Sequence, residues 1–240
     1  MADVVYPPVI AALRALFRAL DLKIRVEGAE HVPRTGGAVL ASNHVSYLDF
    51  IFAGLGARAS GRLTRFMAKQ EIFAHPIGGP LMRGMHHLPV DRSAGIASYK
   101  AALAALKAGE VVGIFPEATI SESFTVKDIK DGAARLAAGA GVPLIPVALW
   151  GTQRLWTKGR PRTLTRRHTP ITILVGEPMH PTRRDNKDEL SAALRARMQS
   201  LLDRAQQEYP DKPDGTDDSW WLPAHLGGTA PAPSDVDSRP

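Results

Sequence analysis

Residues 41–50, with the sequence ASNHVSYLDF, place His44 and Asp49 five positions apart, directly after a run of small apolar residues. Such a run predicts a strand, so His44 falls at its end and Asp49 in the first turn of the next helix. From there the carboxylate can reach back to the imidazole, hold one tautomer and stabilise the imidazolium, as the acid of a Ser–His–Asp triad does. The pair is a candidate general base with its orienting acid, at the edge where open α/β sheets bind ligands.

The same residues have two other interpretations. Ser46 followed by Asp49 three positions later resembles a capping box, so Asp49 would simply favour a helix N-terminus. In an esterase or lipase-type hydrolase, Ser42 or Ser46 would be the nucleophile and His44 its base, although neither serine lies in a nucleophile-elbow motif. The simpler scheme takes the hydroxyl of the substrate as the nucleophile.

Alternating strands and helices position these residues. Candidate strands are the apolar stretches 22–28, 37–43, 63–69, 86–91, 111–115, 143–150 and 171–176. Helical patterns lie over about 46–56, 93–107, 127–139 and 185–208. Several strands are nearly continuous apolar runs, as strands buried on both faces are. The pattern predicts an α/β fold with a mostly parallel central sheet and helices on both faces.

Residues 1–21 form a predicted amphipathic helix in front of this body. Its apolar residues recur at helical spacing on one side, so it either packs on the core or lies in a membrane interface with Arg14 and Arg18 at the headgroups. The segment is too short and too broken by these arginines to span a bilayer. It also has no basic leader and no convincing cleavage site, so it is not a secretory signal.

Residues 22–209 form the predicted domain, and the composition changes after Tyr209. Residues 210–240 are rich in Pro, Asp, Gly and Ser, which predicts a mostly disordered tail, with Trp220-Trp221 as a potential docking point. The tail is acidic, so residues 1–210 carry more than the net charge of +6 of the whole chain. A body this basic favours an anionic partner: nucleic acid, anionic lipid or a phosphorylated substrate.

Other composition features exclude several classes of site. The chain has 240 residues, enough for one large domain, and no cysteine, which excludes disulfides, thiolate nucleophiles and Cys-ligated metals. Nucleic-acid motifs are absent, so we expect no nucleic-acid partner. His86-His87 has no further ligand at metal spacing, so no metal is expected. The stretch 75–80, HPIGGP, lacks the Lys-Ser/Thr ending of a phosphate loop and is predicted to be a turn.

Four motifs together resemble a known family. They are NHVSYLD (43–49), LPVDR (88–92), FPEATIS (115–121) and VPLIPVALWGT (142–152), and they come in the order and at the spacings of the glycerolipid acyltransferases. The chain is similar in particular to the bacterial 1-acylglycerol-3-phosphate, or lysophosphatidate, acyltransferases. The resemblance covers roughly residues 24–180, and the segment 68–82 also looks like the family's connection between the first two motifs.

The resemblance implies a role for each matching residue. His44 would take the proton from the acceptor hydroxyl, with Asp49 orienting it. Arg92 would bind the acceptor's phosphate, with Lys69 as a further cation, and Glu117 would help to position the acceptor. The remaining implied site residues are Asn43, Phe115, Pro116 and Thr119 on the substrate side and Pro146 on the acyl-donor side.

The implied reaction moves a fatty acyl chain from acyl-CoA or acyl carrier protein to a lysophospholipid, preferably lysophosphatidate, and gives phosphatidic acid for phospholipid biosynthesis without a cofactor. A thioester is already activated, so direct attack needs only a base, an oriented hydroxyl and a group that stabilises the oxyanion. Backbone N–H groups at the start of helix 46–56 are candidates for that last role. The enzyme would lie peripherally on the anionic cytoplasmic face of the membrane.

Three residues depart from the family's pattern. The third motif usually reads E-G-T-R, whereas this chain has Ala118 and Ile120 at the second and fourth positions. The second motif usually has a glycine where this chain has His86. These departures concern the acceptor, so another lysolipid or a lipid-linked sugar is an alternative to lysophosphatidate. A membrane-binding module without catalysis is the alternative of another class.

Two basic runs, 157–168 and 183–184, have no assigned role. They are either solvated loop charge or, if they face the same way as the N-terminal helix, a surface for lipid or for cofactor phosphates.

Overall fold

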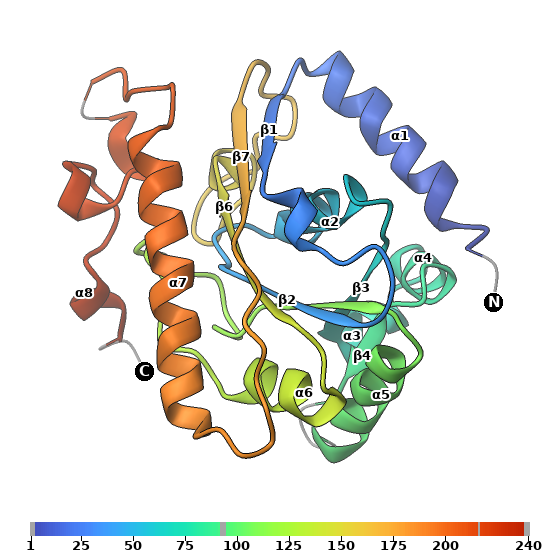
Figure 1. Cartoon of the computed structure of the whole chain (residues 1–240). Helices are drawn as coiled ribbons and strands as arrows, with labels where there is room; N and C mark the ends of the chain where they lie inside the picture. The colour runs from blue at the N-terminus through green and yellow to red at the C-terminus, as the bar shows by residue number, and fades with distance from the viewer. Residues whose placement is uncertain (1–2, 92–94, 216, 238–240) are drawn as a thin grey trace.

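Seven strands of the computed structural model lie in one sheet in the order β1-β7-β6-β2-β5-β3-β4 (Figure 1). The structure describes residues 3–91, 95–215 and 217–237. All neighbouring strands run parallel except β6 and β7, which are antiparallel. Every predicted strand is confirmed, with these bounds: β1 (Lys23–Glu27), β2 (Ala38–Ser42), β3 (Thr64–Lys69), β4 (Leu88–Val90), β5 (Val111–Ile114), β6 (Leu144–Trp150) and β7 (Pro170–Val175).

Helices cover both faces of the sheet, as its continuous apolar strands require (Figure 1). Helix α2 (Asp49–Arg58) packs on one face, where Ala38 and Leu40 of β2 meet Phe52. Helices α5 (Gly95–Lys107), α6 (Gly132–Ala140) and α7 (Lys187–Gln207) pack on the other face, where Val39 of β2 meets Leu106. Successive strand residues thus alternate between two cores.

Two short helices were not predicted from the sequence. Helices α3 (Gln70–Ala74) and α4 (Gly78–Gly84) follow β3 directly. The turn predicted over 75–80 is confirmed only for residues 75–77, where His75 Nδ1 accepts the backbone N–H of Gly78 at 3.0 Å. Residues 78–80 are instead the first turn of α4.

The N-terminal helix α1 (Tyr6–Ala19) lies against the α2 side of the body (Figure 1). Its start is fixed by the Tyr6 hydroxyl, which donates to Thr64 O at 2.7 Å, and by Asp3, which pairs with the buried Arg65. Tyr6 is the only buried residue of the helix. Within the described residues, no helix is both long and apolar enough to cross a membrane.

The C-terminal segment packs on the body around Trp221. Two 3₁₀ turns, η3 (Ser219–Trp221) and η4 (Ala224–Leu226), precede the short helix α8 (Pro233–Asp237). The Trp221 side chain is fully buried, and the Arg154 guanidinium lies 4.4 Å from the centroid of its ring. The expected docking point at Trp220-Trp221 is therefore present. The described part of 210–240 is more ordered than its composition predicts, because one large aromatic side chain finds a place in the core.

Removing this docking side chain should unfold the protein more easily. We expect Trp221→Ala to lower the free energy of unfolding by about 3–5 kcal/mol, the usual loss for a large buried aromatic side chain. Trp220→Ala should cost much less, because Trp220 is only partly buried. Urea denaturation followed by circular dichroism measures both. A loss below about 1 kcal/mol for Trp221→Ala would show that the segment does not contribute to the folded state.

Candidate active site

The connections after β2 and β5 leave one edge of the sheet toward opposite faces. These strands are neighbours in the sheet, and β2 leads to α2 on one face while β5 leads to α6 on the other. The carboxyl ends of the two strands are therefore a switch point, the place where open α/β sheets bind their ligands. His44 follows β2 and Glu117 follows β5, so the first and third sequence motifs meet there.

His44 and Asp49 form the predicted pair. The His44 Nδ1 atom lies 3.0 Å from Asp49 Oδ2. Because a carboxylate only accepts hydrogen bonds, Nδ1 carries the proton and Nε2 has the lone pair. Within the described residues Nε2 makes no hydrogen bond, and the imidazole keeps 20% of its side-chain surface exposed. The histidine is thus arranged as a base that faces outward.

Asp49 is fully buried and accepts four hydrogen bonds. Besides His44, its Oδ2 accepts the backbone N–H groups of Val45 and Ser46, each at 2.7 Å. Its Oδ1 accepts the hydroxyl of Thr152 at 2.6 Å. The geometry is compatible with both the capping interpretation and the catalytic one, since one carboxylate holds both the loop before α2 and the imidazole.

Most of the oxyanion donors predicted at the start of α2 are already occupied. Every backbone N–H from residue 44 to residue 49 donates within the protein: to Glu117, to Asp49 twice, to Trp156 O, to the Ser46 hydroxyl and to Ser46 O. The reason is that Asp49 folds the loop back on itself, which consumes the groups that an isolated helix N-terminus would offer.

Aromatic stacking fixes the plane of the imidazole. The ring of Phe115 lies 4.3 Å from that of His44, tilted by 23°. Phe66 stacks on the other side of Phe115, with 6.0 Å between the ring centroids. Phe115 thus contacts the imidazole, while its predicted contact with substrate stays a prediction.

Glu117 supports the histidine from below rather than facing the solvent. Its Oε1 accepts the His44 backbone N–H at 2.8 Å and its Oε2 accepts that of Lys127 at 3.0 Å. The side chain is buried, and burial raises its pKa to about 7, against the two N–H donors that lower it. In this geometry Glu117 makes a backbone contact that positions His44, and its contact with the acceptor stays a prediction.

Three polar side chains near the site have other roles. The amide of the buried Asn43 binds Leu149 of β6, donating to its O at 3.0 Å and accepting its N–H at 2.7 Å. Asn43 therefore joins two strands, and a contact with substrate stays a prediction. The Ser42 hydroxyl donates to Asn43 O and that of Ser46 to Trp156 O, and both serines are buried. Neither can act as the nucleophile of a hydrolase in this arrangement.

The other site residues predicted from the sequence lie at different depths. Lys69 is exposed at the carboxyl end of β3, and Thr119 is exposed and accepts from Lys127 Nζ at 3.2 Å. Pro116 and Pro146 are buried, and Pro146 lies in β6 opposite Ala41. Arg92 lies outside the described residues. Within the described residues no group of three or more His, Cys, Asp or Glu side chains is placed to hold a metal ion.

Two of the departures from the family's pattern have the backbone conformation that favours glycine. Ala118 has φ 62° and His86 has φ 56°, both in the left-handed region. A residue with a Cβ is destabilised by about 1–2 kcal/mol in this region, whereas glycine adopts it without strain. This explains the glycine of the family's pattern, and its replacement here adds local backbone strain. The third departure, Ile120, is buried and points away from solvent.

Thr152 is a site residue that the sequence analysis missed. It lies in the turn η2 (Thr152–Arg154), directly after β6, and its fully buried hydroxyl holds Asp49. The same turn is fixed by the C-terminal segment, since Gln153 donates to Trp221 O at 3.3 Å and Arg154 pairs with Asp211. The sequence feature that could have predicted Thr152 is the Gly-Thr pair at the end of the fourth motif. This pair follows a predicted strand, at the edge of the sheet where His44 also lies.

Comparison with known proteins gives consistent results. A family model described as Acyltransferase matches residues 23–150. The chain is 30% identical over 194 residues to the 1-acyl-sn-glycerol-3-phosphate acyltransferase of Bacillus subtilis, covering 77% of this chain and 90% of that one. It is 33% identical over 167 residues to the chloroplastic 1-acyl-sn-glycerol-3-phosphate acyltransferase of Arabidopsis thaliana, covering 68% of this chain but only 45% of that protein.

One solved structure shares the fold. The crystal structure of the 1-acyl-sn-glycerophosphate (LPA) acyltransferase PlsC from Thermotoga maritima matches with a TM-score of 0.68. The match covers 82% of this chain and 78% of that one, at 24% sequence identity.

The hydroxyl of Thr152 can be tested without changing the shape of its site. Thr152→Val removes one donor from a buried carboxylate, which typically costs about 1.5–3 kcal/mol. We expect turnover to fall about tenfold or more and its pH dependence to shift, because Asp49 no longer holds His44 as firmly. Thr152→Ser, which keeps the hydroxyl, should restore most of both. Turnover measured from pH 5 to 9 is the readout, and a Val variant with the wild-type rate and profile contradicts the role.

Proposed function

The chain belongs to the acyltransferase family, and we propose that it transfers a fatty acyl chain from a thioester to the free hydroxyl of 1-acyl-sn-glycerol-3-phosphate. The product is phosphatidic acid, used in phospholipid biosynthesis. The observation that carries this proposal is the buried Asp49 holding His44 with Nε2 directed outward. The names of the relatives agree with the acceptor, and the buried serines disfavour a hydrolase.

The proposed reaction needs no covalent enzyme intermediate. His44 Nε2 takes the proton of the acceptor hydroxyl while that oxygen attacks the thioester carbonyl carbon. The tetrahedral intermediate then collapses, the C–S bond breaks, and the leaving sulfur takes the proton from the imidazolium. Asp49 stabilises the imidazolium between these steps, and Glu117 and Phe115 keep the ring in place.

The acceptor's phosphate is assigned to the side of the sheet formed by β3 and β4. Lys69 ends β3 there and pairs in register with Val90 of β4, and the second cation of the proposal, Arg92, comes two positions after Val90 in the sequence. A cation pair suits a phosphate monoester. Because Ile120 is buried, it does not replace the family's arginine at this surface, and Lys69 and Arg92 carry the recognition.

A hydrocarbon chain fits an apolar cavity between α1, α2 and α4. The cavity holds about 220 Å³. Aromatic rings connect it to the base, since Phe50 of its lining contacts Phe66, which stacks on Phe115 beside His44. Its other apolar lining residues include Val9, Leu13, Phe17, Ile51, Leu55 and Leu81.

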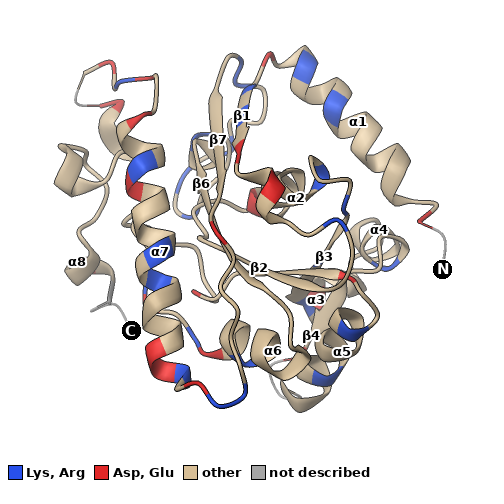
Figure 2. Ribbon diagram, in the orientation of Figure 1, with Lys and Arg blue, Asp and Glu red and all other residues tan. Residues whose placement is uncertain are grey.

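The same side of the molecule is the proposed membrane surface. Exposed apolar side chains gather on α1, α3, α4 and the residues directly before α1 and α4: Val4 and Leu16, then Ile72, Ile77 and Leu81. Helix α4 contacts the start of α1, because Gly84 lies against the side chain of Val5. Together with the arginines of α1 (Figure 2), this arrangement supports peripheral attachment to an anionic membrane, at its cytoplasmic face.

The catalytic proposal is tested by removing the base. General-base catalysis is worth roughly 10²- to 10⁴-fold, so His44→Ala should lose at least about a hundredfold in transfer rate. The exposed His180 is a matched control, and His180→Ala should keep the wild-type rate. Transfer of a labelled palmitoyl chain to lysophosphatidate is the measurement. A folded His44→Ala protein with near-normal turnover contradicts the proposal. So does a wild type that only releases the palmitoyl chain to water and transfers none of it to lysophosphatidate.

The membrane surface is tested by point substitutions, because deleting α1 would also remove the Asp3 and Tyr6 contacts with the body. Ile77→Glu combined with Leu81→Glu should weaken binding to anionic phosphatidylglycerol vesicles at least about tenfold, since each buried apolar side chain contributes roughly 1.5–3 kcal/mol. Leu164→Glu, an exposed apolar position outside this surface, is the control. Sedimentation with vesicles measures the binding, and equal losses in both proteins would show that the surface is placed wrongly.

A further inference from the structure

The connection between β6 and β7 is a strongly basic surface, here called the basic arm and defined as residues 155–169. It contains five Lys and Arg residues and no Asp or Glu. Figure 2 shows Lys and Arg along this connection. Its cations are Lys158, Arg160, Arg162, Arg166 and Arg167.

The basic arm touches the loop that carries the catalytic histidine. Trp156 O accepts the Ser46 hydroxyl at 2.6 Å and the Tyr47 N–H at 3.2 Å. Thr157 in turn donates its hydroxyl to Val45 O at 2.6 Å. The basic arm therefore begins beside this loop, and the carboxyl end of β6 directs it away from the neighbouring β2.

Two arginines of the basic arm are held by aromatic rings rather than by acids. The Arg160 guanidinium lies 5.1 Å from the ring centroid of Trp220, and that of Arg162 lies 5.3 Å from the ring of Trp156. Lys158 pairs with Glu122 at 2.7 Å. Among the residues described by the structure, the four arginines of the basic arm make no ion pair. Stacking restrains Arg160 and Arg162 without neutralising their charge, so all four arginines remain available to an anionic partner.

The strand order separates this surface from the acceptor side. His44 follows β2, with β5, β3 and β4 on one side of it and β6 and β7 on the other. Lys69, the cavity and the exposed apolar side chains of α3 and α4 all belong to the first side. The basic arm, on the second side, exposes a single large apolar side chain, Leu164. A surface so poor in apolar groups is poorly suited to insertion in a bilayer.

We infer that the basic arm is the docking surface for an acidic protein that carries the acyl thioester, and this inference rests on the proposed function. Its cations are spread over ten positions of exposed chain, from Lys158 to Arg167, which suits the extended acidic face of a protein better than the compact phosphates of a nucleotide. Docking there would bring the thioester to His44 from the side opposite to the acceptor. The two substrates would then not compete for the same cations.

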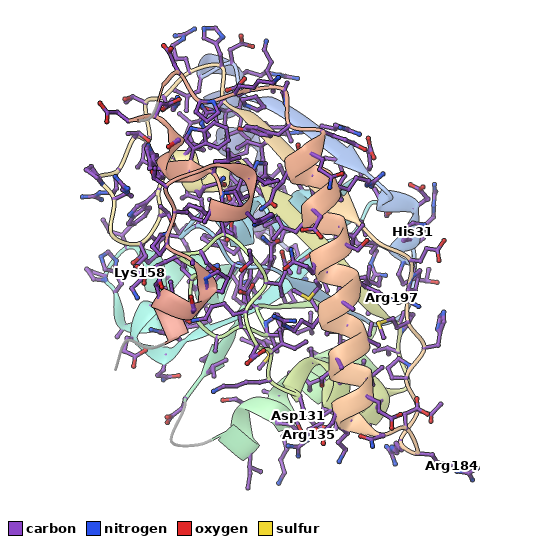
Figure 3. All side chains as sticks on the ribbon, turned by 90° about the vertical axis from the view of Figure 1, so that its left-hand side faces the viewer. His31, Asp131, Arg135, Lys158, Arg184 and Arg197 are labelled. Atoms are coloured by element: carbon purple, nitrogen blue, oxygen red, sulfur yellow. The ribbon has the colours of Figure 1, made fainter. Side chains whose placement is uncertain are left out.

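The second basic run lies elsewhere. Figure 3 shows Lys158 on one side of the molecule and Arg184 and Arg197 on the other. Residues 157–168 precede β7 and residues 183–184 follow it, so the strand separates them. The two basic runs therefore do not form one surface, as they would in a shared site for lipid or cofactor phosphates. The region around residues 183–184 supplies a matched control instead.

The test compares two donors with the same palmitoyl chain, one on a purified bacterial acyl carrier protein and one on coenzyme A. The variant of the basic arm is Arg160→Gln, Arg162→Gln and Arg167→Gln together. The control loses the same charge through Arg184→Gln, Lys187→Gln and Arg197→Gln. We expect the ratio of kcat/KM for the carrier protein to kcat/KM for the coenzyme to fall about tenfold or more in the first variant only, because charge steering sets the association rate.

The other possible outcomes distinguish a failure of the docking surface from a failure of the proposed acyltransferase function. A wild type that uses neither donor contradicts the proposed function itself. A wild type that uses the coenzyme alone, or a ratio unchanged by the three substitutions, overturns the docking surface and leaves the reaction standing. Loss of binding to phosphatidylglycerol vesicles with an unchanged ratio would assign the basic arm to lipid headgroups instead. For the wild type, kcat/KM with the carrier protein should also fall more steeply with salt than that of the variant.

Discussion

The buried carboxylate of Asp49 is the interaction on which the site depends. An unpaired charge in a fully buried position is costly, so this side chain is stable only while its hydrogen-bond donors stay in place. Those donors come from three places: the imidazole, the loop of residues 45 and 46, and the turn after β6. The need to satisfy one charge therefore fixes the base, the start of α2 and the relation of β2 to β6 together.

A second buried carboxylate completes this frame from β5. Glu117 connects the backbone of His44 to that of Lys127, at the switch point from which the connections leave toward opposite faces. The segment around Lys127 is in turn held by α7, because Arg195 donates to the carbonyls of residues 126 and 127. The histidine is thus supported on both sides by acids that contact the backbone. A base held in this way needs little reorganisation when the imidazolium forms.

Sequence patterns were sufficient to predict those features that residues close together in the chain determine. Continuous apolar runs predicted every strand, and the spacing of His44 and Asp49 predicted their contact, since one strand end and one helix turn determine it. Thr152 could not be found in this way, because its partner lies 103 positions away. Asn43 and Glu117 were placed on the substrate side by the resemblance of their motifs to the family, whereas their bonds to Leu149 and to His44 depend on neighbouring strands. The order around Trp221 was hidden by a polar composition that one buried ring outweighs.

The asymmetry of the molecule follows from the same strand order. A lysolipid is an amphiphile that must leave a membrane, whereas a thioester on a soluble carrier arrives from water. The side of β3 and β4 combines exposed apolar helices, an apolar cavity and a cation at a strand end, as the first substrate requires. The side of β6 and β7 is basic and largely polar, which suits the carrier that we infer docks there. His44 lies between the two sides because β2 is the central strand of the sheet, so in the proposed reaction a single base serves two substrates that approach from different sides.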